Sequence, residues 1–345
     1  MSTVIRVAAV GDILISNSII QSSRCEDIGG YDFRPVFRYV APLLKRADLV
    51  IGNLEVPLAG ATGGRFTYRH PKTGFFTFHA PDELAAALKD AGFHVLLTGN
   101  NHCLDRGIAG LVRTLEVLDG HQLAHTGTYR MPEEAHTPLV LNVHGVRVAV
   151  LSYSKSTNKL PLPGSRSWMV NLLDEDKMLA DLAKARQLAD AVIVCPHFGR
   201  EYTHQPVAVQ KRIVRKLLEG GADLVLGAHP HVVQPVVRPN ERQAAVYSLG
   251  NFVSTTLMNH AATRRGLIVL AELHKDEHGA VKLQQLECVP TWVRRRRTAQ
   301  GRKYEVIPVP NATIAADVPN DLTPAERRAM LKAAKHTMDI VKRKV

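Results

Sequence analysis

The order of hydrophobic and polar positions predicts strands and helices that alternate along most of the chain. Short runs of apolar residues are typical of strands buried on both faces of a sheet. Segments with apolar residues three or four positions apart follow most of these runs and predict amphipathic helices. The predicted strands are Val4–Val10, Asp48–Ile51, Phe93–Leu97, Ala191–Cys195 and Leu224–Leu226, and the predicted helices are Pro35–Ala47, Asp82–Ala91, Gly107–Leu118, Asp174–Leu188 and Pro206–Glu219.

Other apolar runs predict additional strands without intervening helices. Leu139–Asn142 and Val146–Ser152 flank His144-Gly145 and predict a hairpin. Later in the chain, three β-rich segments follow one another, namely Ala244–Leu249, Gly266–Leu273 and Val281–Val293. Together these patterns predict an α/β fold with mixed sheets.

A separate helix is expected at the end of the chain. Thr323-Pro324-Ala325-Glu326 is a capping box with proline at the first helical position. We therefore expect one main domain over residues 1–310 and an amphipathic, basic helix over 321–345. Its predicted apolar stripe favours packing on the main domain, with membrane-surface or partner docking as the alternative. The stripe consists of Leu331, Ala334, Met338 and Val341.

Composition favours a soluble globular protein of the cytoplasm. Of the 345 residues, 45% are hydrophobic and 22% are charged. No secretory signal or membrane span is evident, since the apolar runs are too short. The cysteines are far apart and form no C-x-x-C pair, which favours free thiols in a reducing compartment. They are Cys25, Cys103, Cys195 and Cys288.

The net charge indicates an anionic partner. The formal charge is +12 and the isoelectric point is near 9.7, which favours a phosphorylated compound, a glutamyl polymer or peptide, or another polyanion. Basic residues are scattered apart from the run Arg294–Arg297, and aromatic residues make up 6% of the chain. Specific nucleic-acid binding is therefore not expected, and a solvated basic face is the simpler alternative. The pattern specifies no oligomeric state.

Metal-type side chains recur where predicted strands end, usually beside a glycine. The carboxyl edge of an open α/β sheet is where ligands bind, so these side chains are expected to meet. Carboxylate, amide and imidazole together suit one or two divalent ions such as manganese, iron or zinc. The residues are Asp12, Asn53, Glu55, Asn100, Asn101, His102, His197, His229 and His231.

The ordered set of these motifs resembles the CapA family of poly-γ-glutamate capsule synthesis proteins, which is itself similar to calcineurin-like metallophosphoesterases. The resemblance covers roughly residues 5–255. It implies a four-layer αββα sandwich of mixed sheets with a metal cleft. The motifs are Gly11-Asp12, Gly52-Asn53-Leu54-Glu55, Gly99-Asn100-Asn101-His102 with Asp105, His197-Phe198-Gly199 with Glu201-Tyr202, His229-Pro230-His231 with Gln234, and Ser248-Leu249-Gly250-Asn251-Phe252.

The resemblance also implies a role for each motif residue. Asp12 and His231 would bind one ion, and Glu55, aided by Asn53, would bridge to a second. The second ion would be bound by Asn101, His197 and His229.

Four further residues would complete the cleft. His102 matches the histidine that contacts phosphate and assists the leaving group, and Asp105 would orient it. Glu201 and Asn251 would line the cleft or support the ligands.

The chain departs from the metallophosphoesterase pattern at two positions. The first motif carries Leu14 at the histidine position of the Asp-x-His pattern, and the second motif carries Asn53 in place of an aspartate, with Glu55 two residues further on. Leu14 removes one ligand, and both changes weaken the first site, so occupancy by one ion or by two stays open.

The preferred function is hydrolysis of a phosphate ester, with His102 protonating the leaving group. One alternative is a metal-dependent enzyme that acts on peptides, as a hydrolase or as an epimerase in which His102 and Asp12 move a proton. Another is a non-catalytic subunit that binds poly-γ-glutamate.

Basic residues in two loops, 60–79 and 155–168, would suit binding of an anionic substrate, or they are solvated loop charges. They are Arg65, Arg69, Lys72, Lys155, Lys159 and Arg166.

Overall fold

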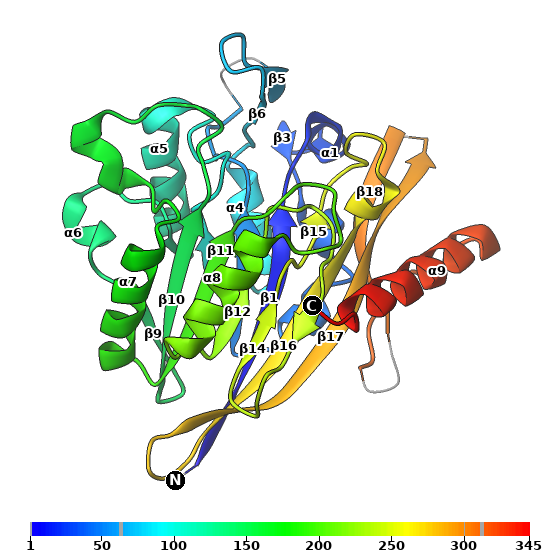
Figure 1. Cartoon of the computed structure of the whole chain (residues 1–345). Helices are drawn as coiled ribbons and strands as arrows, with labels where there is room; N and C mark the ends of the chain where they lie inside the picture. The colour runs from blue at the N-terminus through cyan, green and yellow to red at the C-terminus, as the bar shows by residue number, and fades with distance from the viewer. Residues whose placement is uncertain (1, 62–64, 300, 311–313) are drawn as a thin grey trace.

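Two β-sheets packed face to face form the centre of the protein (Figure 1). The structure is a computed structural model that describes residues 2–61, 65–299, 301–310 and 314–345. Apolar side chains of both sheets fill the space between them, including Val7, Ile51, Val148 and Ile193.

The first sheet follows the order β18-β17-β16-β1-β4-β7-β8, and β15 also pairs with β1. From β1 to β8 neighbouring strands are parallel, whereas β16, β17 and β18 are antiparallel. The strands are β1 (Thr3–Ile13), β4 (Leu49–Leu54), β7 (Val95–Leu97), β8 (Ala124–Thr126), β15 (Asn251–Val253), β16 (Arg265–Lys275), β17 (Val281–Thr298) and β18 (Gly301–Pro308).

The second sheet follows the order β13-β14-β12-β11-β10-β9. Its inner strands are parallel, and both edge strands are antiparallel to their neighbours. The strands are β9 (Leu139–Val143), β10 (Val146–Ser154), β11 (Ala191–His197), β12 (Leu224–Leu226), β13 (Val236–Val237) and β14 (Ala244–Val246).

Helices cover the outer faces of both sheets, so the protein has four layers. Side chains alternate along a strand: in β1, Val7 and Ala9 face the second sheet, whereas Ala8 and Val10 face the helices. The predicted four-layer αββα sandwich is confirmed. The helices are α1 (Asn17–Ser22), α2 (Arg34–Phe37), α3 (Ala41–Leu44) and α4 (Glu83–Asp90) against the first sheet, α7 (Glu175–Leu188) and α8 (Ala208–Glu219) against the second, and α5 (Gly107–Gly120), α6 (Pro132–Ala135) and the 3-10 turns η1 (Gly164–Met169) and η2 (Ala261–Arg264) around them.

The prediction of one helix over Pro35–Ala47 is wrong, because the segment forms the two short helices α2 and α3. Pro42 lies at the start of α3. Proline has no amide hydrogen to donate and its ring clashes with the preceding turn, so one continuous helix would be broken there.

The C-terminal helix α9 (Pro324–Val341) packs against β16 and β17, as the favoured alternative predicted. The predicted stripe is wrong at Leu331, which is 52% exposed, whereas Val341 is buried and Ala334 and Met338 are partly buried. Met330 and Ala333 are buried against Trp292 instead. The capping box is present, with Thr323 Oγ1 accepting a hydrogen bond from the amide of Glu326. No helix in the described ranges is long and apolar enough to cross a membrane.

The long loop predicted over 59–79 contains a small hairpin of β5 (Thr67–Arg69) and β6 (Phe76–Phe78). Residues 62–64 of this loop lie outside the described residues. Another small hairpin pairs β2 (Arg24–Cys25) with β3 (Gly30–Tyr31).

Candidate metal centre

The carboxyl ends of β1, β4, β7, β11 and β12 meet at one edge of the sandwich. Asp12 pairs in register with Asn53 of β4 on one side and with Asn251 of β15 on the other. This register requires glycine before Asp12: a Cβ at Gly11 would lie 1.8 Å from the carbonyl oxygen of Gly250. The glycine beside the ligand position therefore lets β15 approach β1 closely.

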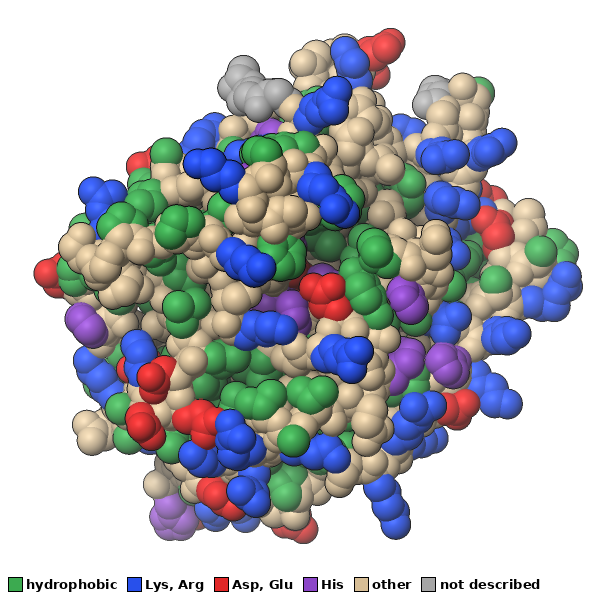
Figure 2. All heavy atoms as spheres, turned by 45° about the horizontal axis from the view of Figure 1, so that its top comes forward, with side chains coloured by type: hydrophobic (Ala, Val, Ile, Leu, Met, Phe, Trp, Pro, Cys, Tyr) green, Lys and Arg blue, Asp and Glu red, His purple; other side chains and the backbone are tan. Residues whose placement is uncertain are grey.

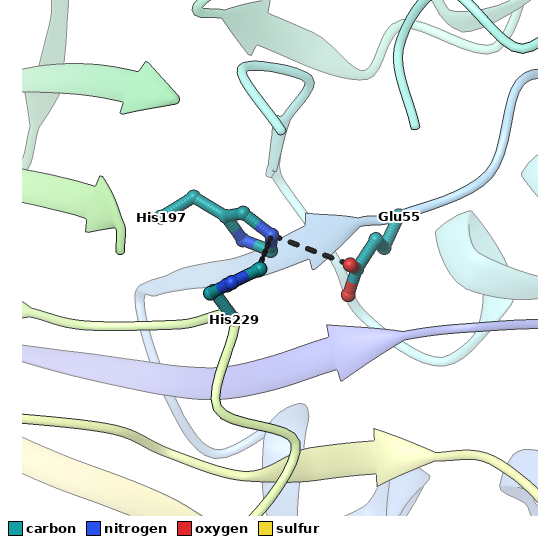
Figure 3. Close-up of side chains that lie close together, drawn as sticks. All are labelled: Glu55, His197 and His229. Carbon is teal, nitrogen blue, oxygen red and sulfur yellow. Dashed lines mark hydrogen bonds and ion pairs between the residues drawn. The ribbon is translucent and has the colours of Figure 1, made fainter. Parts of the chain in front are cut away.

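One group of ligand-type side chains converges on His197 (Figure 3). Its Nε2 lies 3.2 Å from His229 Nδ1, 3.3 Å from Glu55 Oε1 and 2.6 Å from Asn101 Oδ1. Two nitrogen and two oxygen atoms thus lie close together, with His197 Nε2 in contact range of the other three, which is a donor set suited to zinc, iron or manganese.

A second group combines Asp12, Glu55 and His231. His231 Nδ1 lies 3.2 Å from Asp12 Oδ2 and 3.8 Å from Glu55 Oε2. Glu55 therefore belongs to both groups, and its two oxygens face different histidines.

The buried carboxylate of Glu55 fits a divalent ion. The side chain is 0% exposed, and neither carboxylate oxygen has a hydrogen-bond partner. Burial and the nearby negative charge of Asp12 raise the pKa of Glu55 well above its ordinary value. A buried carboxylate without hydrogen bonds is costly unless a cation neutralises it, and an ion shared by the two groups would do so.

The histidines of the two groups differ in charge. Burial lowers the pKa of His197 to about 4, and burial and the neighbouring His197 lower that of His229. Both imidazoles are therefore neutral, which is the form that binds metal. Burial alone would lower the pKa of His231, but Glu55 and Asp12 outweigh it and raise this pKa to about 10.

The segment that carries His229 and His231 has an unusual backbone. Their φ angles are +94° and +59°, in the left-handed region that residues other than glycine rarely adopt. Such strained conformations concentrate at functional sites, where the surrounding structure enforces them.

His102 and Asp105 form a buried pair beside the metal groups. Asp105 Oδ2 lies 2.7 Å from His102 Nδ1 and accepts a hydrogen bond from the amide of Phe78. Burial opposes protonation of His102, but the charge of Asp105 outweighs it and raises the pKa of His102. The predicted orienting partner thus lies in contact with its histidine.

A pocket of about 440 Å³ opens onto these residues. Figure 2 shows the face of the molecule that carries it, hollowed at its centre, with acidic, histidine and apolar side chains in the hollow and basic side chains around it. Arg69 is the one basic loop residue of the predicted set that lines this pocket. The lining also includes Leu14, Phe75, Phe76, Asn101, His102, Asn158, Glu201, Tyr202, His231 and Met258.

Two predicted residues occupy supporting positions. Asn251 Oδ1 lies 3.0 Å from His231 Nδ1, and Asn251 donates a hydrogen bond to the carbonyl of Thr263. Asn53 directs its amide nitrogen at Asp12 Oδ1, 2.7 Å away. In this orientation, Asn53 holds Asp12 through its nitrogen, whereas a metal would need its oxygen.

The sequence prediction places Asn100 among the converging side chains without assigning it a role, and the structure shows that it organises the site. Its amide nitrogen donates to Asn53 Oδ1 and to the carbonyl of Leu54, and its Oδ1 accepts from the amide of His102. The adjacent asparagines in the sequence are the signal that could have identified it. The sequence prediction also does not include Asn158, which lies in the 155–168 loop. No motif or strand end in the sequence points to this residue.

Comparison with solved structures identifies a similar fold. A Staphylococcus aureus protein named as a candidate 5'-nucleotidase, solved in complex with alpha-ketoglutarate, aligns with a TM-score of 0.52 and 14% identity. The alignment covers 98% of this chain and 58% of that chain. At this identity, the likeness establishes the fold alone.

Comparison with curated proteins and family models identifies closer relatives. The capsule biosynthesis protein CapA of Bacillus anthracis is 30% identical over 283 residues, which cover 79% of this chain and 64% of the relative. The PGA biosynthesis protein CapA of Bacillus subtilis is 28% identical over 285 residues, which cover 81% and 70%. The model for the bacterial capsule synthesis protein PGA_cap matches residues 6–256, so the chain belongs to this family.

Proposed function

We propose that this protein is a metal-dependent hydrolase of phosphate esters that acts in the biosynthesis of a poly-γ-glutamate capsule. The observation that supports it most directly is Glu55, a buried carboxylate without hydrogen-bond partners that belongs to both ligand groups. The capsule context comes from the names of the relatives.

In this proposal, His197, His229 and Asn101 hold one divalent ion, Asp12 and His231 hold another, and Glu55 serves both. Bound ions supply Lewis acidity, which activates water and neutralises charge on phosphoryl oxygens. Asn53 and Asn251 keep Asp12 and His231 in place through the hydrogen bonds described above.

His102 would donate the proton that the leaving group needs. It lines the pocket, and Asp105 holds its Nδ1 at 2.7 Å, which leaves Nε2 for the substrate. The charge of Asp105 raises the pKa of His102. A larger fraction of the molecules therefore has a protonated His102 at neutral pH, as a general acid requires. Glu201 and Arg69 lie at the pocket wall, where they would contact the rest of the substrate.

The epimerase-like alternative has less support, because Asp12 is committed to other partners. Its Oδ1 accepts from Asn53, and its Oδ2 lies 3.2 Å from His231. Burial would raise the pKa of Asp12, but these partners outweigh it and lower the pKa. A carboxylate with a lowered pKa is a poor base for a carbon-bound proton.

The decisive experiment removes metal with a chelator and restores manganese, iron or zinc before assaying p-nitrophenyl phosphate and bis(p-nitrophenyl) phosphate. We expect metal-dependent turnover that Glu55→Gln and His229→Ala each reduce by more than about 100-fold, since even outer-sphere changes at metal sites cost 10–100-fold. The exposed pair Glu277→Gln and His278→Ala provides matched controls. Equal rates in all five proteins would rule out catalysis at this site.

Two further assays separate the alternatives. Deuterium uptake from heavy water into a glutamyl peptide, without phosphatase activity, would indicate the peptide enzyme. Salt-sensitive binding of poly-γ-glutamate by both wild type and Glu55→Gln, with no turnover of any substrate, would indicate a polymer-binding subunit.

A further inference from the structure

Asn158 contacts the metal centre although it lies outside every motif. It belongs to the loop between β10 and η1 and lines the same pocket as His102 and His231. Its side chain is buried, with 8% of the residue exposed. Its φ angle is +51° and that of Lys159 is +62°, so the loop holds two consecutive residues in the left-handed region.

One end of the Asn158 amide fixes the orientation of Asn101. Asn158 Oδ1 accepts a hydrogen bond of 3.2 Å from Asn101 Nδ2. Asn101 Oδ1 then faces His197 Nε2, 2.6 Å away. An amide binds a metal through oxygen and not through nitrogen. Because Asn158 accepts a hydrogen bond from Asn101 Nδ2, it favours the orientation of Asn101 in which Oδ1 is free to bind metal.

The other end of the Asn158 amide has no partner. Asn158 Nδ2 is buried and makes no hydrogen bond. Buried donors are nearly always satisfied by protein, water or ligand. Asn158 lines a pocket together with His102 and Asn101, so an oxygen atom of a molecule bound there is a candidate partner for this buried donor.

We propose that Asn158 is a substrate-binding and positioning residue: Nδ2 donates to an anionic oxygen of the substrate, and Oδ1 holds Asn101 in its metal-binding orientation. This inference rests on the proposed metal-dependent function. The chemical class of the bound group is a tetrahedral oxyanion such as a phosphoryl group, because a donor beside a metal cluster favours an oxygen that carries negative charge.

Two substitutions separate the two roles. Asn158→Gly removes both ends of the amide, and glycine tolerates the left-handed backbone. Asn158→Asp keeps an acceptor for Asn101 Nδ2 but replaces the donor with a negative charge. Asn259, an exposed left-handed asparagine with φ +63°, provides the matched controls Asn259→Gly and Asn259→Asp.

The measurements are calorimetric titrations of metal-free protein with Mn²⁺, and of Mn²⁺-loaded protein with inorganic phosphate. For Asn158→Gly, we expect Mn²⁺ affinity to fall about 10- to 100-fold and phosphate affinity to fall about tenfold or more. For Asn158→Asp, we expect Mn²⁺ affinity within about threefold of wild type, because the acceptor remains, and phosphate affinity reduced at least as much as in the glycine variant. Both Asn259 variants should match wild type.

The inference is overturned if Asn158→Gly binds Mn²⁺ as wild type does, or if Asn158→Asp binds phosphate as wild type does. Failure of the proposed function looks different, because wild type itself would then bind no Mn²⁺ or would bind it without hydrolysing either phosphate ester. A thermal melt of each variant shows whether it is folded, so a loss of affinity in a folded Asn158→Gly protein is assigned to the amide.

Discussion

Arg294 should contribute more to stability than any neighbour in the run Arg294–Arg297, because its charge is buried. The residue is 3% exposed. Its guanidinium lies 2.9 Å from Asp321, 2.9 Å from Glu326 and 3.2 Å from Glu305. The alternative of a solvated basic face therefore does not hold for Arg294, which joins β17 to the first turn of α9.

The magnitude of the Arg294→Met effect follows from what the substitution leaves behind. Removing one partner from a buried ion pair costs about 3–5 kcal/mol. Glu305 would still have Arg38 at 2.8 Å and Arg296 at 3.4 Å, and Asp321 is 55% exposed. We therefore expect the lower end of the range, about 3 kcal/mol, which lowers the melting temperature by about 5 °C in a chain of this size.

The assay is urea unfolding followed by circular dichroism at pH 7, 5 and 3.5. The hydrogen bond from Arg294 lowers the pKa of Glu326 to about 2 from 4.5. Stability from this pair is thus fully present above pH 4.5 and is lost as the pH falls toward 2, so the difference from wild type should shrink at pH 3.5. The exposed Arg297→Met is the control. Equal stability of the two variants at pH 7, or a difference that does not change with pH, would refute the reasoning.

Three other predictions concern the metal centre. Mn²⁺ at a hundredfold excess over its dissociation constant should raise the free energy of unfolding by about 2.7 kcal/mol; thermal melts should show this gain in His278→Ala and not in His229→Ala. Asp105→Asn should lower the pKa of His102, whose present rise depends on Asp105, so the alkaline limb of the pH–rate profile moves to lower pH; an unmoved limb would exclude His102 as the general acid. Leu14→His should tighten the weaker of two Mn²⁺ affinities in calorimetry, because Leu14 lines the same pocket as His231; the same weak affinity in Leu14→Ala and Leu14→His would contradict this.

Much of the fold could be predicted because local sequence patterns decide it. Strands such as β11 are buried over their whole length and appear as continuous apolar runs. Ligand residues such as His197 come at the ends of these strands, and parallel strands bring their carboxyl ends to one edge. A one-dimensional list of strand ends therefore indicates which side chains meet, although it contains no distances.

The features that the sequence did not predict depend on contacts between residues far apart in the chain, which a local sequence pattern does not indicate. In β17, Arg294 is buried and Arg295 is exposed, yet the acids that pair with Arg294 lie 11 to 32 residues away in sequence. The buried face of α9 begins at Met330 and not at Leu331. Packing against β16 and β17 determines which face is buried. Asn158 lies in a loop without periodicity, so only the three-dimensional structure places it beside Asn101.

The two ligand groups differ in a way that bears on how the protein would use metal. The group around His197 offers two neutral imidazoles, the Glu55 carboxylate and the oxygen of Asn101, which would be enough ligands for one bound divalent ion. The other group offers Asp12, His231 and the same Glu55, which is one donor residue fewer. The second ion therefore depends on sharing Glu55 and would bind more weakly. At limiting metal, the His197 group should fill first, and the Asp12 group should fill only as the metal concentration rises.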